Sequence, residues 1–265
     1  MTLLQTVILA IVQGLTEFLP ISSSGHLVLV PYLFDWADQG LAFDVAVHFG
    51  SLVAVCIFFR KDLASLLAGG VQALGGNVKT PESRFALAIA LGTVPAALAG
   101  LFLSSFIADR LRDPTVIVYT LSGYGILMAI ADRYGRRERK RASVGFTDAL
   151  ILGLAQALAL VPGTSRSGVT ITAARILGFE RLDAARFSFL LSAPVILLAA
   201  AYKFVELLTN GATVAWAQLG FGALVACMVA YLSIEFFMRF VSRIGLVPVA
   251  IYRVVLAAVI LYVLV

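Results

Sequence analysis

A short N-terminal stretch gathers side chains that could do chemistry inside an otherwise apolar segment. It reads Gln13-Gly-Leu-Thr-Glu17-Phe-Leu-Pro-Ile-Ser-Ser-Ser-Gly-His26, a carboxylate, three consecutive hydroxyls and an imidazole. Glu17 follows Gln13 by four residues, so the two side chains face one side of a helix. A buried carboxylate there could act as a general base, or hold a divalent cation together with phosphate oxygens of a substrate.

His26 lies directly after the hydroxyl cluster. This position suits activation of a nucleophile, direct attack on phosphorus or protonation of a leaving phosphate, and the sequence leaves these roles open. His48, the second of two histidines, lies in an apolar run without a polar cluster, so we interpret it as a structural group.

A second stretch, Pro162-Gly-Thr-Ser-Arg-Ser-Gly168, brings an arginine between apolar segments. An arginine at membrane depth is costly and by default marks a functional site. The planar guanidinium of Arg166 suits bidentate contact with phosphate. The structural alternative is a buried ion pair with Glu17, and both hold if Arg166 pairs with Glu17 when the site is empty and with phosphate when it is occupied.

Both stretches place hydroxyls where a second short helix is expected to start. A helix start exposes unpaired N–H groups and a partial positive charge, which together favour anions. Capping of the helix and contact with an anionic ligand are both open to these serines. They are Ser22, Ser23, Ser165 and Ser167.

The elements that must position these residues are short apolar helices in pairs. The first pair covers residues 3–19 and 26–34 and the second covers 148–161 and 169–177, each interrupted at a proline. None reaches the roughly 20 residues that span a bilayer. We therefore predict two re-entrant hairpins, which require burial in protein or a wet cavity at the break.

Six further apolar runs predict membrane-spanning helices, with an additional helical piece at 62–74 in a glycine-rich connector. Arg253 lies within the last run, where we expect it to pair with an acid such as Glu235. The predicted spans are Val45–Phe59, Phe85–Leu103, Thr115–Ala131, 187–203, 214–238 and 246–265.

Basic residues set the expected orientation. The segment 132–141 is the strongest charge run and is expected to be a solvated cytoplasmic loop. Most other arginines and lysines then fall inside, and Arg110, Arg112 and Lys203 fall outside. This orientation puts the first hairpin on the outer face and the second on the cytoplasmic face.

The chain also repeats itself. A shift of 143 residues aligns Gln13 with Gln156, Ser22 with Ser165 and Gly25 with Gly168, among other identities. Each half reads as a hairpin plus three spans, which inverts the second half relative to the first. We predict one all-α membrane domain, 1–265, with an inverted-topology repeat: repeat one at about 1–131, a basic loop at about 132–147 and repeat two at about 148–265.

Composition excludes several classes of protein. With 61% hydrophobic and 13% charged residues, the chain is too apolar for a soluble domain. The net charge of +5 comes from short loops, so it indicates membrane topology and no nucleic-acid partner. Cys56 and Cys227 lie in apolar runs and predict no disulfide, and the N-terminus lacks the features of a signal peptide.

The two polar stretches resemble the signature segments of bacterial undecaprenyl-diphosphate phosphatases, the family associated with bacitracin resistance. The resemblance extends to Phe187-Ser-Phe-Leu-Leu-Ser-Ala-Pro194 and Ala-Ile-Tyr-Arg253. It implies an enzyme of the bacterial cytoplasmic membrane that hydrolyses undecaprenyl diphosphate to the monophosphate carrier lipid and phosphate. It further implies a divalent cation, Mg²⁺ or Ca²⁺, and a site that opens to the outer face.

The resemblance also assigns roles to residues. Glu17, Ser23, His26 and Arg166 match the catalytic set, with Glu17 as the metal-binding carboxylate. Gln13 falls where many members carry a second glutamate, so Glu17 has to act without a charged neighbour. Ser22, Ser165, Ser167 and Thr170 match supporting positions, and together with Gln13 they are expected to bind substrate.

Two other classes of membrane protein share parts of this pattern. A polyprenyl-phosphate transporter or flippase is the main alternative, because inverted repeats and broken helices are common in transporters. The PAP2-type membrane phosphatases expect a histidine and an aspartate after Ser-Arg, and Ser165-Arg166 is followed by neither. The substrate lipid and membrane lipids are the expected partners, and a homodimer is left open.

Overall fold

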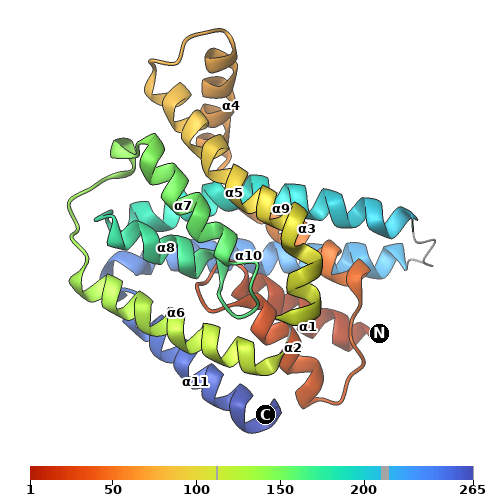
Figure 1. Ribbon diagram of the computed structural model, residues 1–265. Helices are drawn as coiled ribbons and strands as arrows, with labels where there is room; N and C mark the ends of the chain where they lie inside the picture. Colours follow the sequence, from red (N-terminus) through yellow and green to blue (C-terminus); the bar gives the residue numbers. More distant parts are fainter. Residues whose placement is uncertain (112, 210–214, 265) are drawn as a thin grey trace.

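The regular secondary structure of the described residues is helical. The computed structural model describes residues 1–111, 113–209 and 215–264 (Figure 1), and this part of the chain contains eleven α-helices and one short 3₁₀-helix, Arg141–Ser143. Arg112, one of the three basic residues expected outside, lies outside the described residues, as do the first residue of the predicted span 214–238 and the last of 246–265.

Five helices are long and apolar enough to cross a membrane, and α11 (Val247–Leu264) is apolar but shorter. With α11 they correspond to the six predicted spans, and α4 (Arg60–Leu74) confirms the helical piece predicted at 62–74. The chain is therefore an all-α polytopic membrane protein. The five are α3 (Leu41–Phe58), α5 (Pro81–Arg110), α6 (Pro114–Tyr134), α9 (Arg181–Thr209) and α10 (Trp216–Ile244).

The two broken segments form the predicted hairpins. The first consists of α1 (Leu3–Thr16) and α2 (Ser23–Leu33), the second of α7 (Phe146–Leu158) and α8 (Arg166–Ile176). The helices α2 and α8 both have 11 residues and begin 143 positions apart, the shift that aligned the sequence. The residues before them, Ser22 (φ 75°) and Ser165 (φ 68°), both adopt the left-handed conformation that is uncommon outside glycine.

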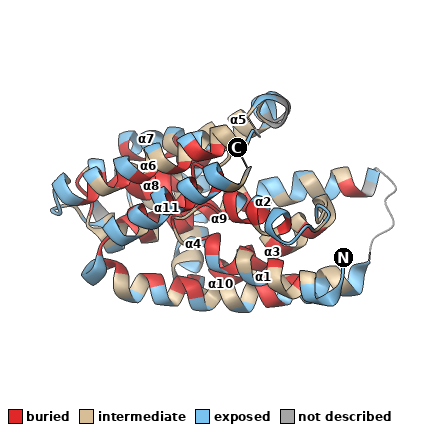
Figure 2. Ribbon diagram, turned by 90° about the horizontal axis from the view of Figure 1, so that it is seen from below, coloured by how far each residue is buried: buried red, intermediate tan, exposed pale blue. Residues whose placement is uncertain are grey.

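Packing repeats in the same way. Helix α1 lies against α10, and its counterpart α7 lies against α5; α3 contacts α9, and α6 contacts α11. Figure 2 shows buried residues on most of the helices, mixed with exposed ones. Of the five long apolar helices, α9 is the most buried, with 61% of its most apolar 18-residue stretch inside the protein. Phe189 on α9 makes ring contacts with Phe18, Phe59 and Phe237 at centroid distances of 5.3, 6.2 and 5.8 Å.

Close helix contacts depend on glycines. A Cβ on Gly50 of α3 would lie 2.1 Å from the carbonyl oxygen of Ala223 on α10. We expect Gly50→Ala to destabilise the protein by roughly 1–3 kcal/mol, because two backbones would have to separate. Gly123→Ala in α6 is the matched control, since its Cβ would meet nothing within 4 Å, and alanine favours a helix interior. Thermal unfolding in detergent measures both, and equal midpoints would contradict the prediction.

The basic loop is less solvated than expected. Arg139 donates to Asp148 at 2.9 and 2.6 Å and lies 4.3 Å from the ring centroid of Phe179. Burial raises the pKa of Asp148, but hydrogen bonds from Arg139 and from the Gly145 N–H outweigh it and hold the pKa below its ordinary value. These bonds fix the loop to the start of α7, the first helix of the second hairpin.

Candidate active site

A cavity of about 380 Å³ lies between the two hairpins. One part of its wall is apolar and comes from α3, α5 and α9, including Val45, Ala96 and Ile196. The polar part is lined by Glu17, Ser22, Ser23, Ser24, Asp44, His48, Gln156, Ser165, Arg166 and Lys203.

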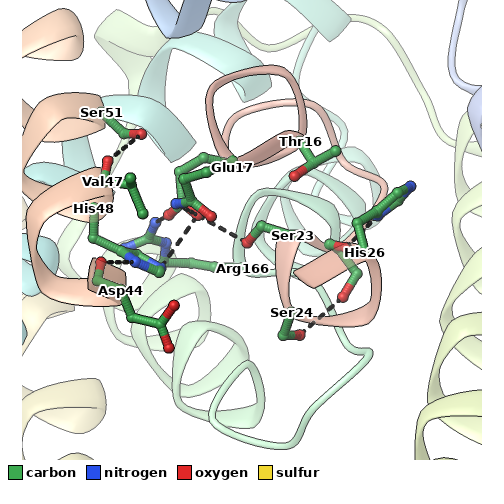
Figure 3. Close-up of polar contacts among 12 residues, drawn as sticks. Thr16, Glu17, Ser23, Ser24, His26, Asp44, Val47, His48, Ser51 and Arg166 are labelled. Carbon is green, nitrogen blue, oxygen red and sulfur yellow. Dashed lines mark hydrogen bonds and ion pairs between the residues drawn. The ribbon is translucent and has the colours of Figure 1, made fainter. Parts of the chain in front are cut away.

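Glu17 is the centre of the polar part (Figure 3). Its Oε1 accepts a hydrogen bond from the Arg166 guanidinium, with which it forms an ion pair. Its Oε2 accepts hydrogen bonds from Gln13 Nε2 and Ser23 Oγ, both at 2.8 Å. The Glu17 side chain is 4% exposed and that of Arg166 17%. The predicted pairing of Glu17 with Arg166 and the shared helix face of Gln13 and Glu17 are both confirmed.

The two helix starts meet at this carboxylate. Ser23 is the first residue of α2, and Arg166 is the first residue of α8. Each helix start adds partial positive charge from its unpaired N–H groups. The arrangement can therefore bind an anion and draw the proton of the Ser23 hydroxyl toward Glu17.

The remaining serines and Thr170 have different surroundings. Ser165 caps α8, as its Oγ accepts from the Gly168 N–H at 3.2 Å, whereas Ser22 stands at the cap position of α2 without a side-chain cap bond. Ser167 Oγ donates to the Leu19 carbonyl at 3.2 Å, and Thr170 Oγ1 donates to the Arg166 carbonyl at 2.8 Å. Ser167 and Thr170 thus support the two breaks from behind the cavity wall.

Among the described residues, His26 bonds to none of Glu17, Ser23 and Arg166, and it does not line the cavity. Its Nδ1 donates to the Ser22 carbonyl at 2.7 Å, so the Nε2 of the neutral ring accepts from the Tyr252 hydroxyl at 2.6 Å. The ring stacks on Tyr252 and points away from the carboxylate in Figure 3. In this geometry His26 holds the backbone of Ser22 and both of its ring nitrogens are hydrogen-bonded, so its catalytic role stays a prediction.

The interpretation of His48 as a structural group without polar company is wrong. Its Nε2 lies 3.6 Å from Glu17 Oε2, and its Nδ1 donates to the Asp44 carbonyl at 2.7 Å. A proton on Nε2 would convert this contact into an ion pair. Asp44 and His48 both line the cavity, and their spacing of four residues in an apolar run is the signal that could have revealed them. Gln156 and Lys203 were missed as well.

The expected pair of Arg253 with Glu235 is also wrong. Glu235 pairs with Arg239 at 2.7 Å. Arg253 is fully buried and donates to backbone carbonyls at both hairpin breaks: Pro20 at 3.2 Å, Gly163 at 3.1 Å and Thr164 at 2.9 Å. Broken helices leave carbonyls without intrahelical partners, and these are the acceptors that Arg253 satisfies.

The oxygen donors suit a hard divalent cation. Glu17, Asp44 and Ser23 all line the cavity, although no group of three or more His, Cys, Asp or Glu side chains among the described residues is placed to hold a metal ion by itself. Mg²⁺ is commonly bound by one or two carboxylates, with substrate phosphates and water completing its shell. The residues present therefore fit a cation that shares its ligands with a phosphate.

Fold and site together define a polytopic membrane protein with a partly polar cavity between two helical hairpins. Residues 6–259 match the sequence model of the family described as bacitracin resistance protein BacA, and the chain belongs to that family. It is 51% identical over 254 residues to an undecaprenyl-diphosphatase of Nitrosococcus oceani, with 96% of each chain covered. It is 50% identical over 263 residues to one of Thioalkalivibrio sulfidiphilus, with 99% of each covered.

Proposed function

We propose that this chain is an undecaprenyl-diphosphatase, which hydrolyses undecaprenyl diphosphate to undecaprenyl phosphate and inorganic phosphate and so recycles the lipid carrier of cell-wall synthesis. The family and the two relatives of about 50% identity along the whole chain support the assignment. The observation that carries it is the Ser23 hydroxyl, hydrogen-bonded to Glu17 in a cavity that also holds Arg166.

The reaction begins when the diphosphate enters the polar part of the cavity. Arg166 exchanges Glu17 for phosphate oxygens, and the N–H groups at the starts of α2 and α8 add to the charge stabilisation. Phosphoryl transfer depends mainly on such positioning and charge neutralisation. A divalent cation held by Glu17 and Asp44 would neutralise further charge on the phosphate oxygens.

Ser23 Oγ then attacks the terminal phosphorus while Glu17 accepts its proton. The bond between this phosphorus and the bridging oxygen breaks, and the oxygen leaves with undecaprenyl phosphate. Water hydrolyses the phosphoserine, which returns the proton to Ser23 and releases inorganic phosphate. The alternative is direct attack by a water that Glu17 deprotonates.

The apolar wall of the cavity gives the polyprenyl chain a place beside the polar site. We further propose that repeat one (about 1–131) and repeat two (about 148–265) have inverted topologies in the bacterial cytoplasmic membrane. The first hairpin would then enter from the outer face, where the site would receive substrate.

The direct test uses the purified protein in detergent with undecaprenyl diphosphate and Mg²⁺, with and without a chelator. We expect phosphate release that the chelator abolishes. A transporter or flippase would release none and would only move lipid between leaflets. Labelled terminal phosphate distinguishes the two nucleophiles: label trapped on Ser23 supports the serine, and an active Ser23→Ala variant supports water.

Gln156 is expected to bind substrate. It lines the cavity, is 2% exposed, and neither its Nε2 nor its Oε1 bonds to the part of the protein that the structure describes. A hydrogen bond to a charged group is worth about 1.5–3 kcal/mol. We expect Gln156→Leu to raise KM roughly tenfold or more without lowering the unfolding temperature. If the variant were less stable but had an unchanged KM, the Gln156 amide would stabilise the fold and would not bind substrate.

A further inference from the structure

A second cavity, of about 410 Å³, lies where α4, the start of α5 and the segment before α7 meet. It shares no lining residue with the cavity around Glu17. Its wall carries three cationic side chains, Lys79, Arg84 and Arg141, against one carboxylate, Glu82. The remaining lining residues are Ser65, Pro81, Phe85, Ser143, Val144 and Gly145.

Arg141 is held in place at this cavity. It forms an ion pair with Asp62 of α4, and its guanidinium lies 5.0 Å from the ring centroid of Phe85. Its side chain is fixed before any ligand binds, so it loses little freedom on binding. Lys79 and Arg84 are exposed and add two positive charges at the rim.

The wall itself is ordered by hydrogen bonds. Thr80 caps α5 by accepting from the Ser83 N–H at 3.2 Å and donates to Gln72 of α4 at 2.7 Å. Ser83 Oγ donates to the Asn77 carbonyl at 2.7 Å, which closes the connection between α4 and α5. The cavity also lies at the N-terminal ends of α5 and α7, where helix dipoles add positive potential. The charges of Lys79 and Arg84 and the two helix dipoles favour an anion.

The helix beside the cavity indicates which anion. Leu67, Val71 and Leu74 of α4 are 73%, 71% and 91% exposed and lie along one face. Figure 1 shows α4 projecting from the bundle, and it begins with Arg60-Lys61. An apolar face flanked by basic residues is typical of a helix in the membrane interface. A soluble anion would gain nothing from this face, whereas a lipid places its headgroup and its chains within reach of both features.

We propose that this cavity binds the phosphate headgroup of an anionic membrane lipid, with the exposed face of α4 resting in the same leaflet. The phosphate would lie among Lys79, Arg84 and Arg141, and Leu67, Val71 and Leu74 would contact the acyl chains. This site goes beyond the proposed hydrolysis and does not rest on it.

The test measures binding of phosphatidylglycerol and of phosphatidylcholine to the full-length protein in detergent by native mass spectrometry. Lys79→Gln/Arg84→Gln removes two exposed charges and keeps the Arg141–Asp62 pair. Near an anionic surface each basic residue contributes about fivefold, so we expect roughly 25-fold weaker phosphatidylglycerol binding. Arg133→Gln/Arg243→Gln, with the same loss of charge at exposed positions elsewhere, should change binding less than about twofold. Equal losses in the two variants would overturn the site.

A second variant distinguishes a lipid from a free phosphate. Leu67→Ser/Leu74→Ser should weaken phosphatidylglycerol binding severalfold and leave Lys79 and Arg84 in place. If this variant binds the lipid as the wild type does, and inorganic phosphate competes fully with the lipid, the cavity takes a soluble anion and the lipid assignment is wrong. Phosphate release from undecaprenyl diphosphate in detergent should be unchanged in both variants, so failure of either proposal is seen separately.

Discussion

Arg166→Gln should lower kcat/KM for undecaprenyl diphosphate by at least about a thousandfold. An arginine that stabilises a transferring phosphoryl group is worth roughly 10³–10⁵ in rate. Here Arg166 is the cation bound directly to Glu17, and Ser23 hydrogen-bonds to the same carboxylate. Glu17→Gln should cause a comparable loss, because an amide accepts no proton from Ser23. Phosphate release under saturating and subsaturating substrate measures both.

If the ion pair between Glu17 and Arg166 only stabilised the fold, its mutation would also abolish activity, because the protein would unfold. Removing one partner of a buried pair costs about 3–5 kcal/mol, since the other charge is left uncompensated, whereas replacing both can be nearly neutral. We therefore expect each single variant to be less stable than Glu17→Gln/Arg166→Gln. This double variant should regain stability and remain inactive.

Arg239→Gln serves as the control for loss of an arginine from an ion pair. Arg239 pairs with Glu235 at an exposed position away from the cavity, and its loss should change neither stability nor rate appreciably. If the double variant hydrolysed the substrate at a rate near that of the wild type, Glu17 and Arg166 would be structural, and the proposed mechanism would be wrong.

Local sequence signals were sufficient to predict the two hairpins and the pairing of Glu17 with Arg166 in the site. Pro20 and Pro162-Gly163 interrupt apolar runs too short to span a bilayer, and the shift that aligns Gln13 with Gln156 reappears in the starts of α2 and α8. The pairing of Glu17 with Arg166 also followed from the sequence, because two opposite charges at membrane depth have few other partners.

Residues whose roles depend on helix packing could not be placed from the sequence. His48 reaches Glu17 because α3 packs against α1, and His26 turns away because its ring bonds to the Ser22 carbonyl one turn back and to Tyr252 of α11. Neither contact leaves a mark on local composition. From the sequence, a carboxylate is the obvious partner for a buried arginine. The sequence does not show which backbone carbonyls are left without partners at a helix break.

Arg253 is such a case, and Arg253→Met is expected to be the most destabilising single substitution on α11. Besides Pro20, Gly163 and Thr164, the side chain donates to the carbonyls of Thr120 and Leu121 at 3.3 and 3.2 Å, so it joins both breaks to α6. A buried acceptor left without a donor costs about 1–3 kcal/mol. The three break carbonyls would lose this donor, whereas those of Thr120 and Leu121 lie inside α6, so we expect a loss of several kcal/mol, measured as thermal unfolding in detergent.

Arg253→Lys should recover part of this stability, because an ammonium group has three donors and cannot reach all five carbonyls. Pro20 and Thr164 lie just before Ser23 and Arg166, so both variants should lower kcat more than they raise KM, in proportion to their loss of stability. A variant that unfolds like the wild type but has lost hydrolysis would contradict this assignment, because Arg253 would then act on the phosphate itself. Activity is expected to fall in step with stability because Arg253 bonds to the backbone at both hairpin breaks, and these breaks position Ser23 and Arg166.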